Sequence, residues 1–102
     1  MPRTLVSVSP VSEAISRRFF VAVEYFVSIG EINSLSHFCE LYNLSAPRYR
    51  EMRLGYGVAP KPGYKTRYKN LEIEAIHALV ANYPISAQWL ITGRGEMTVG
   101  KK

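Results

Sequence analysis

Residues Ser34 to Gly55 read SLSHFCELYNLSAPRYREMRLG and form the most informative part of this chain. Ser34 and Ser45 are suited to cap two helices, because a serine hydroxyl accepts hydrogen bonds from the orphan amides at a helix N-terminus. Pro47 fits the first turn of the second helix, where its missing N–H costs nothing. Gly55 is expected to end that helix, since glycine readily adopts the left-handed backbone common there. These signals predict two short helices, over residues 35–42 and 46–54.

The connection between the two predicted helices is short. Helices of about nine residues joined by so little chain cannot lie antiparallel, so they must cross steeply, as in a helix-turn-helix. The second helix is then presented outward. Cys39 is expected to be buried and inert between the two helices. The residues expected to face inward are Leu35, Phe38, Cys39, Leu44, Tyr49 and Met52.

Positive charge is concentrated in the 22 residues from Arg48 to Lys69. They carry seven basic residues and one acidic residue, a net charge of +6, whereas the rest of the chain nets −1. A concentrated basic segment marks a surface that binds polyanions, whereas scattered lysines mainly keep a protein in solution. The charge distribution therefore favours nucleic acid as the partner.

The length and composition are those of one domain with a modest core. The chain has 102 residues, of which 47% are apolar and 21% are charged. Its single cysteine, Cys39, cannot form an intrachain disulfide, which favours a reducing cytoplasm. We expect no transmembrane segment and no signal peptide, because no run is long and apolar enough.

The residue types that enzymes and metal sites need are scarce. The chain has no aspartate and only two histidines, His37 and His77. This excludes a Ser-His-Asp triad and disfavours carboxylate-rich magnesium or calcium sites. His37 and Cys39 lie two positions apart on a predicted helix, so they face different directions. We therefore expect no enzymatic activity, no cofactor or metal, and no small-molecule ligand.

The segment before the helix pair predicts an arm and a long helix. Residues 1–11 contain two prolines and no periodicity, which is typical of an extended arm. Ser12 is expected to cap a helix that runs to about Ile29 and is closed by Gly30. The apolar residues at helical spacing on its inward face are Ile15, Phe19, Val23, Phe26 and Val27.

The segment after the helix pair predicts a loop and two helices. Residues 55–70 are rich in glycine, proline and basic residues, and the Pro62-Gly63 step suits a type II turn. Asn70 is expected to cap a fourth helix that ends near Tyr83.

The last predicted helix is short. Ser86 is expected to cap it, Trp89 to join the core, and Gly93 to stop it. The domain is then expected to cover residues 12–97, followed by a frayed tail, 98–102.

The face of the second paired helix opposite Tyr49 and Met52 is the predicted reading surface. Arg50 projects from it, and a guanidinium can pair with guanine O6 and N7 in the major groove. Arg48 and Arg53 flank that face and are better placed for phosphates. The residues expected to face base edges are Ala46, Pro47, Arg50, Glu51 and Leu54. The residues expected to contact phosphates are Ser36, Ser45, Arg48, Arg53, Lys61, Lys65, Arg67 and Lys69.

The same residues allow other interpretations. The outer face can be a solvated charged surface, and Glu51 can pair with Arg48 or a lysine instead of accepting from cytosine N4. Tyr56, Tyr64 and Tyr68 alternate with basic residues, a pattern that can stack the bases of RNA or single-stranded DNA. Such tyrosines more often pack over a domain edge. A basic face can also bind an acidic protein partner.

Two parts of the chain resemble a known family. Residues 35–55 resemble the helix-turn-helix of phage-repressor and Cro-like regulators, the xenobiotic-response-element type. The shared features are a small residue in the first helix (Cys39), a serine after the turn (Ser45) and a glycine after the second helix (Gly55). The segment YPISAQWLITGRGEM, residues 83–97, is similar to the Trp-Leu-x-Thr-Gly-x-Gly-x-Met ending of five-helix bacterial members.

The chain departs from the family pattern at two places. Asn43 occupies the turn where glycine is common, and asparagine tolerates the left-handed backbone better than most residues. The loop over residues 55–70 is also longer than usual.

The resemblance implies an operator-binding transcriptional regulator, usually a homodimer on a pseudo-palindromic site. We therefore expect an all-α, five-helix, repressor-like domain that binds double-stranded DNA through residues 45–54. The dimer contact is expected at the exposed apolar residues of the last helix and the tail, around residues 97–99.

Overall fold

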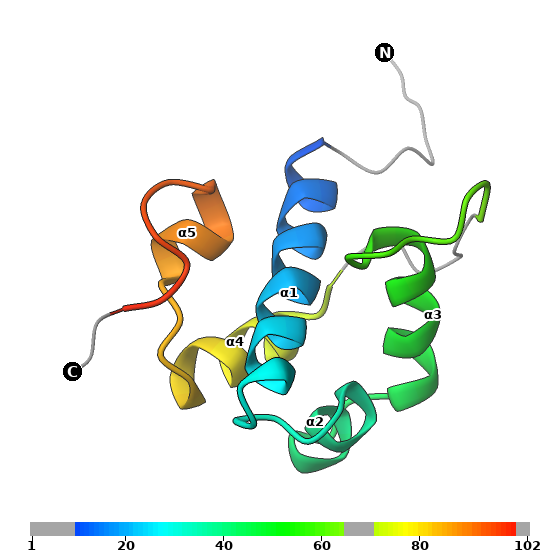
Figure 1. Cartoon of the computed structure of the whole chain (residues 1–102), viewed down its shortest axis with the longest axis horizontal. Helices are drawn as coiled ribbons and strands as arrows, with labels where there is room; N and C mark the ends of the chain where they lie inside the picture. Colours follow the sequence, from blue (N-terminus) through cyan, green and yellow to red (C-terminus); the bar gives the residue numbers. More distant parts are fainter. Residues whose placement is uncertain (1–9, 65–70, 100–102) are drawn as a thin grey trace.

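The computed structural model of this protein describes residues 10–64 and 71–99 (Figure 1). Helices account for most of the described part, and the expected all-α class is confirmed there. The five helices of this part are α1 (Pro10–Ser28), α2 (Leu35–Leu41), α3 (Ala46–Tyr56), α4 (Ile73–Asn82) and α5 (Ala87–Thr92). None of them is long and apolar enough to cross a membrane.

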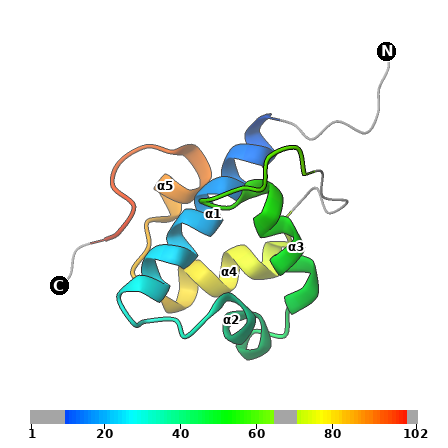
Figure 2. The same cartoon turned by 45° about the vertical axis from the view of Figure 1, so that its right-hand side comes forward.

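Helix α1 is the centre of the packing. It lies between α3 and α5 in both views, and α4 passes behind it in the first (Figures 1 and 2). The ring of Phe19 packs edge-on against Phe20 and Phe38, with centroids 5.2 and 6.0 Å apart, and lies 6.0 Å from the ring of Tyr49. Phe19 therefore joins α1 to both α2 and α3 through ring contacts.

The buried side of α1 is wider than its spacing alone predicts. Phe20 and Ala22 are fully buried beside the expected Phe19, Val23 and Phe26. The expected Ile15 and Val27 are only half-buried. A helix surrounded by neighbours on several sides buries more than one stripe of side chains.

The expected cap at Ser12 is wrong, because α1 already begins at Pro10 and Ser12 lies inside its first turn. Proline is well suited to start a helix, since its missing N–H would have no partner there and its φ is already helical.

The expected caps of α2 and α3 are confirmed. The Ser34 hydroxyl accepts from the His37 amide at 3.0 Å, and the Ser45 hydroxyl accepts from the Arg48 amide at 3.3 Å. Between the helices, Asn43 has a φ of 62°, the left-handed conformation that asparagine tolerates. The Leu44 amide then donates to the carbonyl of Cys39 at 2.7 Å and closes the turn.

The expected end of α3 at Gly55 is wrong. The helix runs on to Tyr56, and Gly57 follows it in an extended conformation with φ −79°. Tyr56 is buried, and the guanidinium carbon of Arg17 lies 5.6 Å from the centre of its ring. Burial of this aromatic ring favours continuation of the helix beyond the glycine.

The loop after α3 makes the expected turn. The Tyr64 amide donates to the Lys61 carbonyl at 3.1 Å across Pro62 and Gly63, and Gly63 has a φ of 75°. This is the left-handed third position that a type II turn requires. The Lys61 amide also donates to the Leu54 carbonyl at 2.8 Å, which ties the loop back to α3.

The expected cap of the fourth helix at Asn70 is also wrong. The N-cap of α4 is Glu72, which makes no side-chain cap hydrogen bond, and Asn70 itself lies outside the described residues. The Glu72 amide instead donates to the Tyr49 hydroxyl at 3.2 Å. A tertiary contact with α3 therefore holds the start of α4.

Helix α5 begins and ends as expected. The Ser86 hydroxyl accepts from the Trp89 amide at 3.1 Å, and Gly93 ends the helix with a φ of 78°. The guanidinium of Arg18 donates from Nε to the Leu90 carbonyl at 2.8 Å and from Nη2 to the Ile91 carbonyl at 3.1 Å. A cation at the C-terminal end of a helix is favourable, because the orphan carbonyls there carry partial negative charge.

The expectation of a frayed tail is wrong for residues 98 and 99. The Ser86 amide donates to the Met97 carbonyl at 2.8 Å, and the Val99 amide donates to the Pro84 carbonyl at 3.0 Å. Ile85 and Thr98 thereby form an isolated antiparallel bridge. Backbone pairing with the α4–α5 connection holds this part of the tail.

The conformation of Gly93 leads to a stability prediction. A Cβ at this position would lie 3.0 Å from Nη1 of Arg18, which two hydrogen bonds hold in place. Gly93→Ala should therefore lower the free energy of unfolding by about 2 kcal/mol, through left-handed strain together with this contact. Urea denaturation measures the change.

Gly30→Ala is the matched control for this prediction. Gly30 has a φ of 85°, but a Cβ added there would meet no atom within 4 Å apart from its own chain neighbours. The Gly30→Ala variant should lose only the free energy of left-handed backbone strain, about 1 kcal/mol. An equal loss in the two variants would mean that the Arg18 contact has no energetic role.

Candidate functional site

The outer face of α3 presents the side chains that the sequence predicts for it. Tyr49 and Met52 are fully buried, as the helical wheel predicts, and Pro47, Arg50 and Leu54 on the opposite side are exposed. Ala46 and Glu51 are half-buried at the edges of that face. In Figure 1, α3 lies at the edge of the molecule, with one side toward α1 and the other toward solvent.

Arg50 is linked to α2. Its Nη1 donates to the Ser36 hydroxyl at 2.9 Å, a contact between exposed side chains 14 residues apart. Ser36 lies in the first turn of α2, so the guanidinium bridges the start of that helix and the outer face of α3. The structure thus brings together one residue expected to read bases and one expected to contact phosphate.

Arg53 is paired with a carboxylate on another helix. Its Nη1 lies 3.4 Å from Oε2 of Glu24, on the neighbouring helix α1. The two residues are 29 positions apart, so no local pattern could have revealed the pair. A Cβ at Gly57 would collide with the carbonyl oxygen of Arg53 and lie 2.7 Å from its Cγ, so glycine leaves room for Arg53 at this position.

The other expected phosphate contacts are only partly described. Ser45 is exposed and caps α3, Arg48 is half-buried, and Lys61 is exposed in the loop after the helix. The remaining three, Lys65, Arg67 and Lys69, lie outside the described residues.

Tyr49 holds α3 in its orientation through contacts on the buried side of the helix. Its hydroxyl donates to Oε1 of Glu72 at 3.0 Å while it accepts from the Glu72 amide at 3.2 Å. Burial, the larger cause, together with the Glu72 carboxylate raises the pKa of the Tyr49 hydroxyl well above its ordinary value. The hydroxyl therefore stays protonated and keeps donating to Glu72.

Cys39 is buried between α2 and the rest of the core, as expected. Burial raises the pKa of its thiol from 9.0 to about 11, although the positive charge of Arg50 acts in the opposite direction. The thiol is the unreactive form, since the thiolate is the nucleophile and the metal ligand. Cys39 is thus a packing residue.

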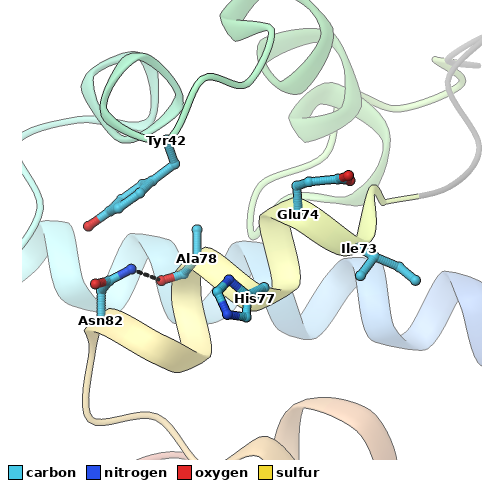
Figure 3. A pocket seen from close by; sticks show the side chains of 6 residues that line it. All are labelled: Tyr42, Ile73, Glu74, His77, Ala78 and Asn82. Atoms are coloured by element: carbon cyan, nitrogen blue, oxygen red, sulfur yellow. Dashed lines mark hydrogen bonds between the residues drawn. The ribbon is translucent and has the colours of Figure 1, made fainter.

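A separate hollow of about 450 Å³ lies between α2 and α4 (Figure 3). The phenol of Tyr42 and the side chain of Ile73 border it, and the amide of Asn82 donates to the Ala78 carbonyl at 2.8 Å. Glu74 and His77 supply its ionisable side chains. Its lining includes no residue of α3, so it is distinct from the basic face.

The described residues offer no metal site, because they contain no group of three or more His, Cys, Asp or Glu side chains that could hold an ion. What the outer face of α3 does offer is guanidinium groups, which form charge-assisted hydrogen bonds with anionic oxygens.

Comparison of the chain with protein families, with curated proteins and with solved structures gave no match. The likeness to Cro-like regulators therefore stays a prediction.

The buried thiol leads to a prediction about pH. The thiol ionises at a lower pH in the unfolded chain than in the folded one, so its contribution to stability is complete below pH 9.0 and is lost as the pH rises toward 11. Wild-type protein should therefore lose about 1 kcal/mol more than Cys39→Ala between about pH 8 and about pH 10. Urea denaturation of both proteins at the two pH values measures this difference.

Burial also raises the pKa of the Tyr49 and Tyr83 hydroxyls above the ordinary value of 10.0, but both residues are present in both proteins. The difference between wild type and variant therefore isolates the thiol. If wild type and Cys39→Ala lost equal amounts of stability between the two pH values, Cys39 would be no more difficult to ionise in the folded state than in the unfolded state.

Proposed function

We propose that this protein is a sequence-specific DNA-binding regulator that inserts α3 into the major groove of double-stranded DNA. The observation that carries the proposal is the outer face of α3, where Pro47, Arg50 and Leu54 are exposed opposite the buried Tyr49 and Met52. A helix with its side chains is about 10–12 Å across, and the major groove is about 12 Å wide. Together, α2, the turn and α3 then act as a helix-turn-helix.

Four of the basic residues have roles in this proposal. Arg50 releases the Ser36 hydroxyl and pairs with guanine O6 and N7, while Ser36 donates to a neighbouring phosphate. Arg48 and Lys61 bind phosphates and release counterions, and Arg53 binds a further phosphate. Ala46, Pro47, Glu51 and Leu54 supply the remaining contacts to base edges. The concentration of positive charge between residues 48 and 69 supports the same surface.

Binding of RNA or single-stranded DNA through the loop tyrosines has less support. Tyr56 is buried against the core and in contact with Arg17, so its ring is not available to stack on a base. A domain for an acidic protein partner would use the same basic face. Preference for one duplex sequence separates the proposed function from both alternatives.

The first experiment is selection of binding sites from a random duplex pool. The proposed function requires a recovered motif, and a two-fold repeat of it would indicate binding as a dimer. Recovery of no motif, together with tighter binding to single strands than to duplex, would support the loop-based alternative and contradict the proposal.

Arg50→Ala should weaken binding to the selected duplex by about 1–3 kcal/mol and relax the preference at one base position, because a bidentate base contact is lost. Lys61→Ala should weaken binding to selected and scrambled duplexes alike and lower the salt slope by roughly one. Titrations of both duplexes over a salt series measure these effects.

Arg94→Ala controls for the change in net charge, because Arg94 is exposed beyond the end of α5, and α5 lies on the opposite side of α1 from α3 (Figure 1). Arg94→Ala should keep the sequence preference and the salt slope of wild type. If Lys61→Ala alters the sequence preference and Arg50→Ala does not, then the loop reads the bases and the docking proposed for α3 is wrong.

We further propose that the protein binds its operator as a homodimer, because one such domain reads too few base pairs for useful specificity. The exposed apolar side chains of Ile91 and Val99, 43% and 52% accessible, supply a contact at α5 and the tail. Sedimentation of the operator complex should give two chains per duplex, and Ile91→Asp should weaken assembly on the operator. One chain per duplex would contradict the homodimer.

A further inference from the structure

A second hollow adjoins the outer face of α3. It has a volume of about 310 Å³ and is lined by Glu24, Arg53, Leu54, Val58 and Ala59. Arg53 and Leu54 follow Arg50 by three and four positions, so they lie on the same side of the helix as Arg50. The hollow therefore continues the surface proposed to face DNA, at the border between α3 and α1.

The ion pair in this hollow is open to solvent and loosely held. The side chains of Arg53 and Glu24 are 41% and 39% accessible, and their nearest charged atoms are 3.4 Å apart. Charge-assisted hydrogen bonds between such groups are usually about 2.7–2.9 Å long. An exposed pair of this kind adds little to folding stability, so an incoming anion can replace the carboxylate at low cost.

We propose that Glu24 is an intramolecular competitor for a DNA phosphate at Arg53. This inference rests on the proposed function and concerns a residue of α1 that has no part in reading bases. In the free protein the carboxylate accepts from the guanidinium, and in the complex a backbone phosphate takes its place. Glu24 is then left beside the phosphate, where like charges repel each other.

The competition has two consequences that can be measured. A guanidinium that is already neutralised by a carboxylate displaces few counterions from DNA, so Arg53 contributes little to the salt dependence while Glu24 is present. Removing the charge of Glu24 turns Arg53 into a full cation. Glu24 thus limits the affinity for any duplex, which reduces binding to non-operator DNA.

The chain contains a matched control on the same helix. Glu13 also accepts from an arginine, with Oε2 at 2.8 Å from Nη2 of Arg17, and these two side chains are 42% and 45% accessible. Glu24→Gln and Glu13→Gln therefore remove the same charge from comparably exposed pairs on α1. Only the first pair lies in the hollow beside α3.

The experiment measures duplex affinity over a salt series for wild type, Glu24→Gln and Glu13→Gln, on the selected and scrambled duplexes. Glu24→Gln should bind both duplexes about three- to tenfold more tightly and steepen the salt slope by up to roughly one, while Glu13→Gln stays within about twofold of wild type. Thermal unfolding should be nearly unchanged in both variants, since the pairs are exposed.

The same substitution in an Arg53→Ala background tests the mechanism. Glu24→Gln should lose most of its effect there, because no guanidinium remains to be released. An equal gain with and without Arg53 would mean that Glu24 repels DNA without competing for Arg53, and would overturn the inference. Equal behaviour of Glu24→Gln and Glu13→Gln, or weaker binding by Glu24→Gln, would overturn it as well.

Failure of this inference is distinguishable from failure of the proposed function. If wild type prefers one duplex and depends on Arg50, but the two glutamine variants behave alike, then only the role of Glu24 is wrong. If wild type binds no duplex, both proposals are overturned.

Discussion

Tyr49 joins three helices through one side chain. Its ring lies 6.0 Å from that of Phe19 on α1, and its hydroxyl holds both the amide and the carboxylate of Glu72 at the start of α4. Because the residue is fully buried, α3 cannot rotate about its axis without breaking these contacts. Which side of α3 faces outward, and therefore which arginines reach the surface, follows from this anchor.

The arginines of the described part divide by what their guanidinium groups contact. Arg18 donates to the last carbonyls of α5, and Arg17 pairs with Glu13 and lies over the ring of Tyr56. These two hold helices together. Arg50 and Arg53 contact Ser36 and Glu24 through exposed side chains, and contacts of that kind are easily exchanged for phosphate or base oxygens. The number of basic residues does not show which arginines hold helices together and which have exchangeable contacts, whereas the groups that each guanidinium contacts do.

Local chemistry explains most of the helix boundaries that could be predicted. The caps at Ser34, Ser45 and Ser86 and the left-handed end at Gly93 depend on atoms within a few residues, so short patterns are sufficient. Two of the wrongly predicted boundaries, the end of α3 and the start of α4, depend on tertiary contacts instead. Gly55 did not end α3 because burial of Tyr56 favours two more helical residues, Gly55 and Tyr56. The start of α4 depends on a hydroxyl 23 residues away.

The candidate site also combines features that follow from the local sequence with features that depend on tertiary packing. The amino-acid order determined that α3 would bury Tyr49 and Met52 and expose Arg50, because side-chain direction along a helix repeats with a fixed period. It also determined where the positive charge is concentrated. Only the tertiary structure decided that Arg50 meets Ser36 and that Arg53 meets Glu24, since these partners lie on other helices, 14 and 29 residues away. Such contacts depend on how α1, α2 and α3 pack, and no spacing within a single helix encodes them.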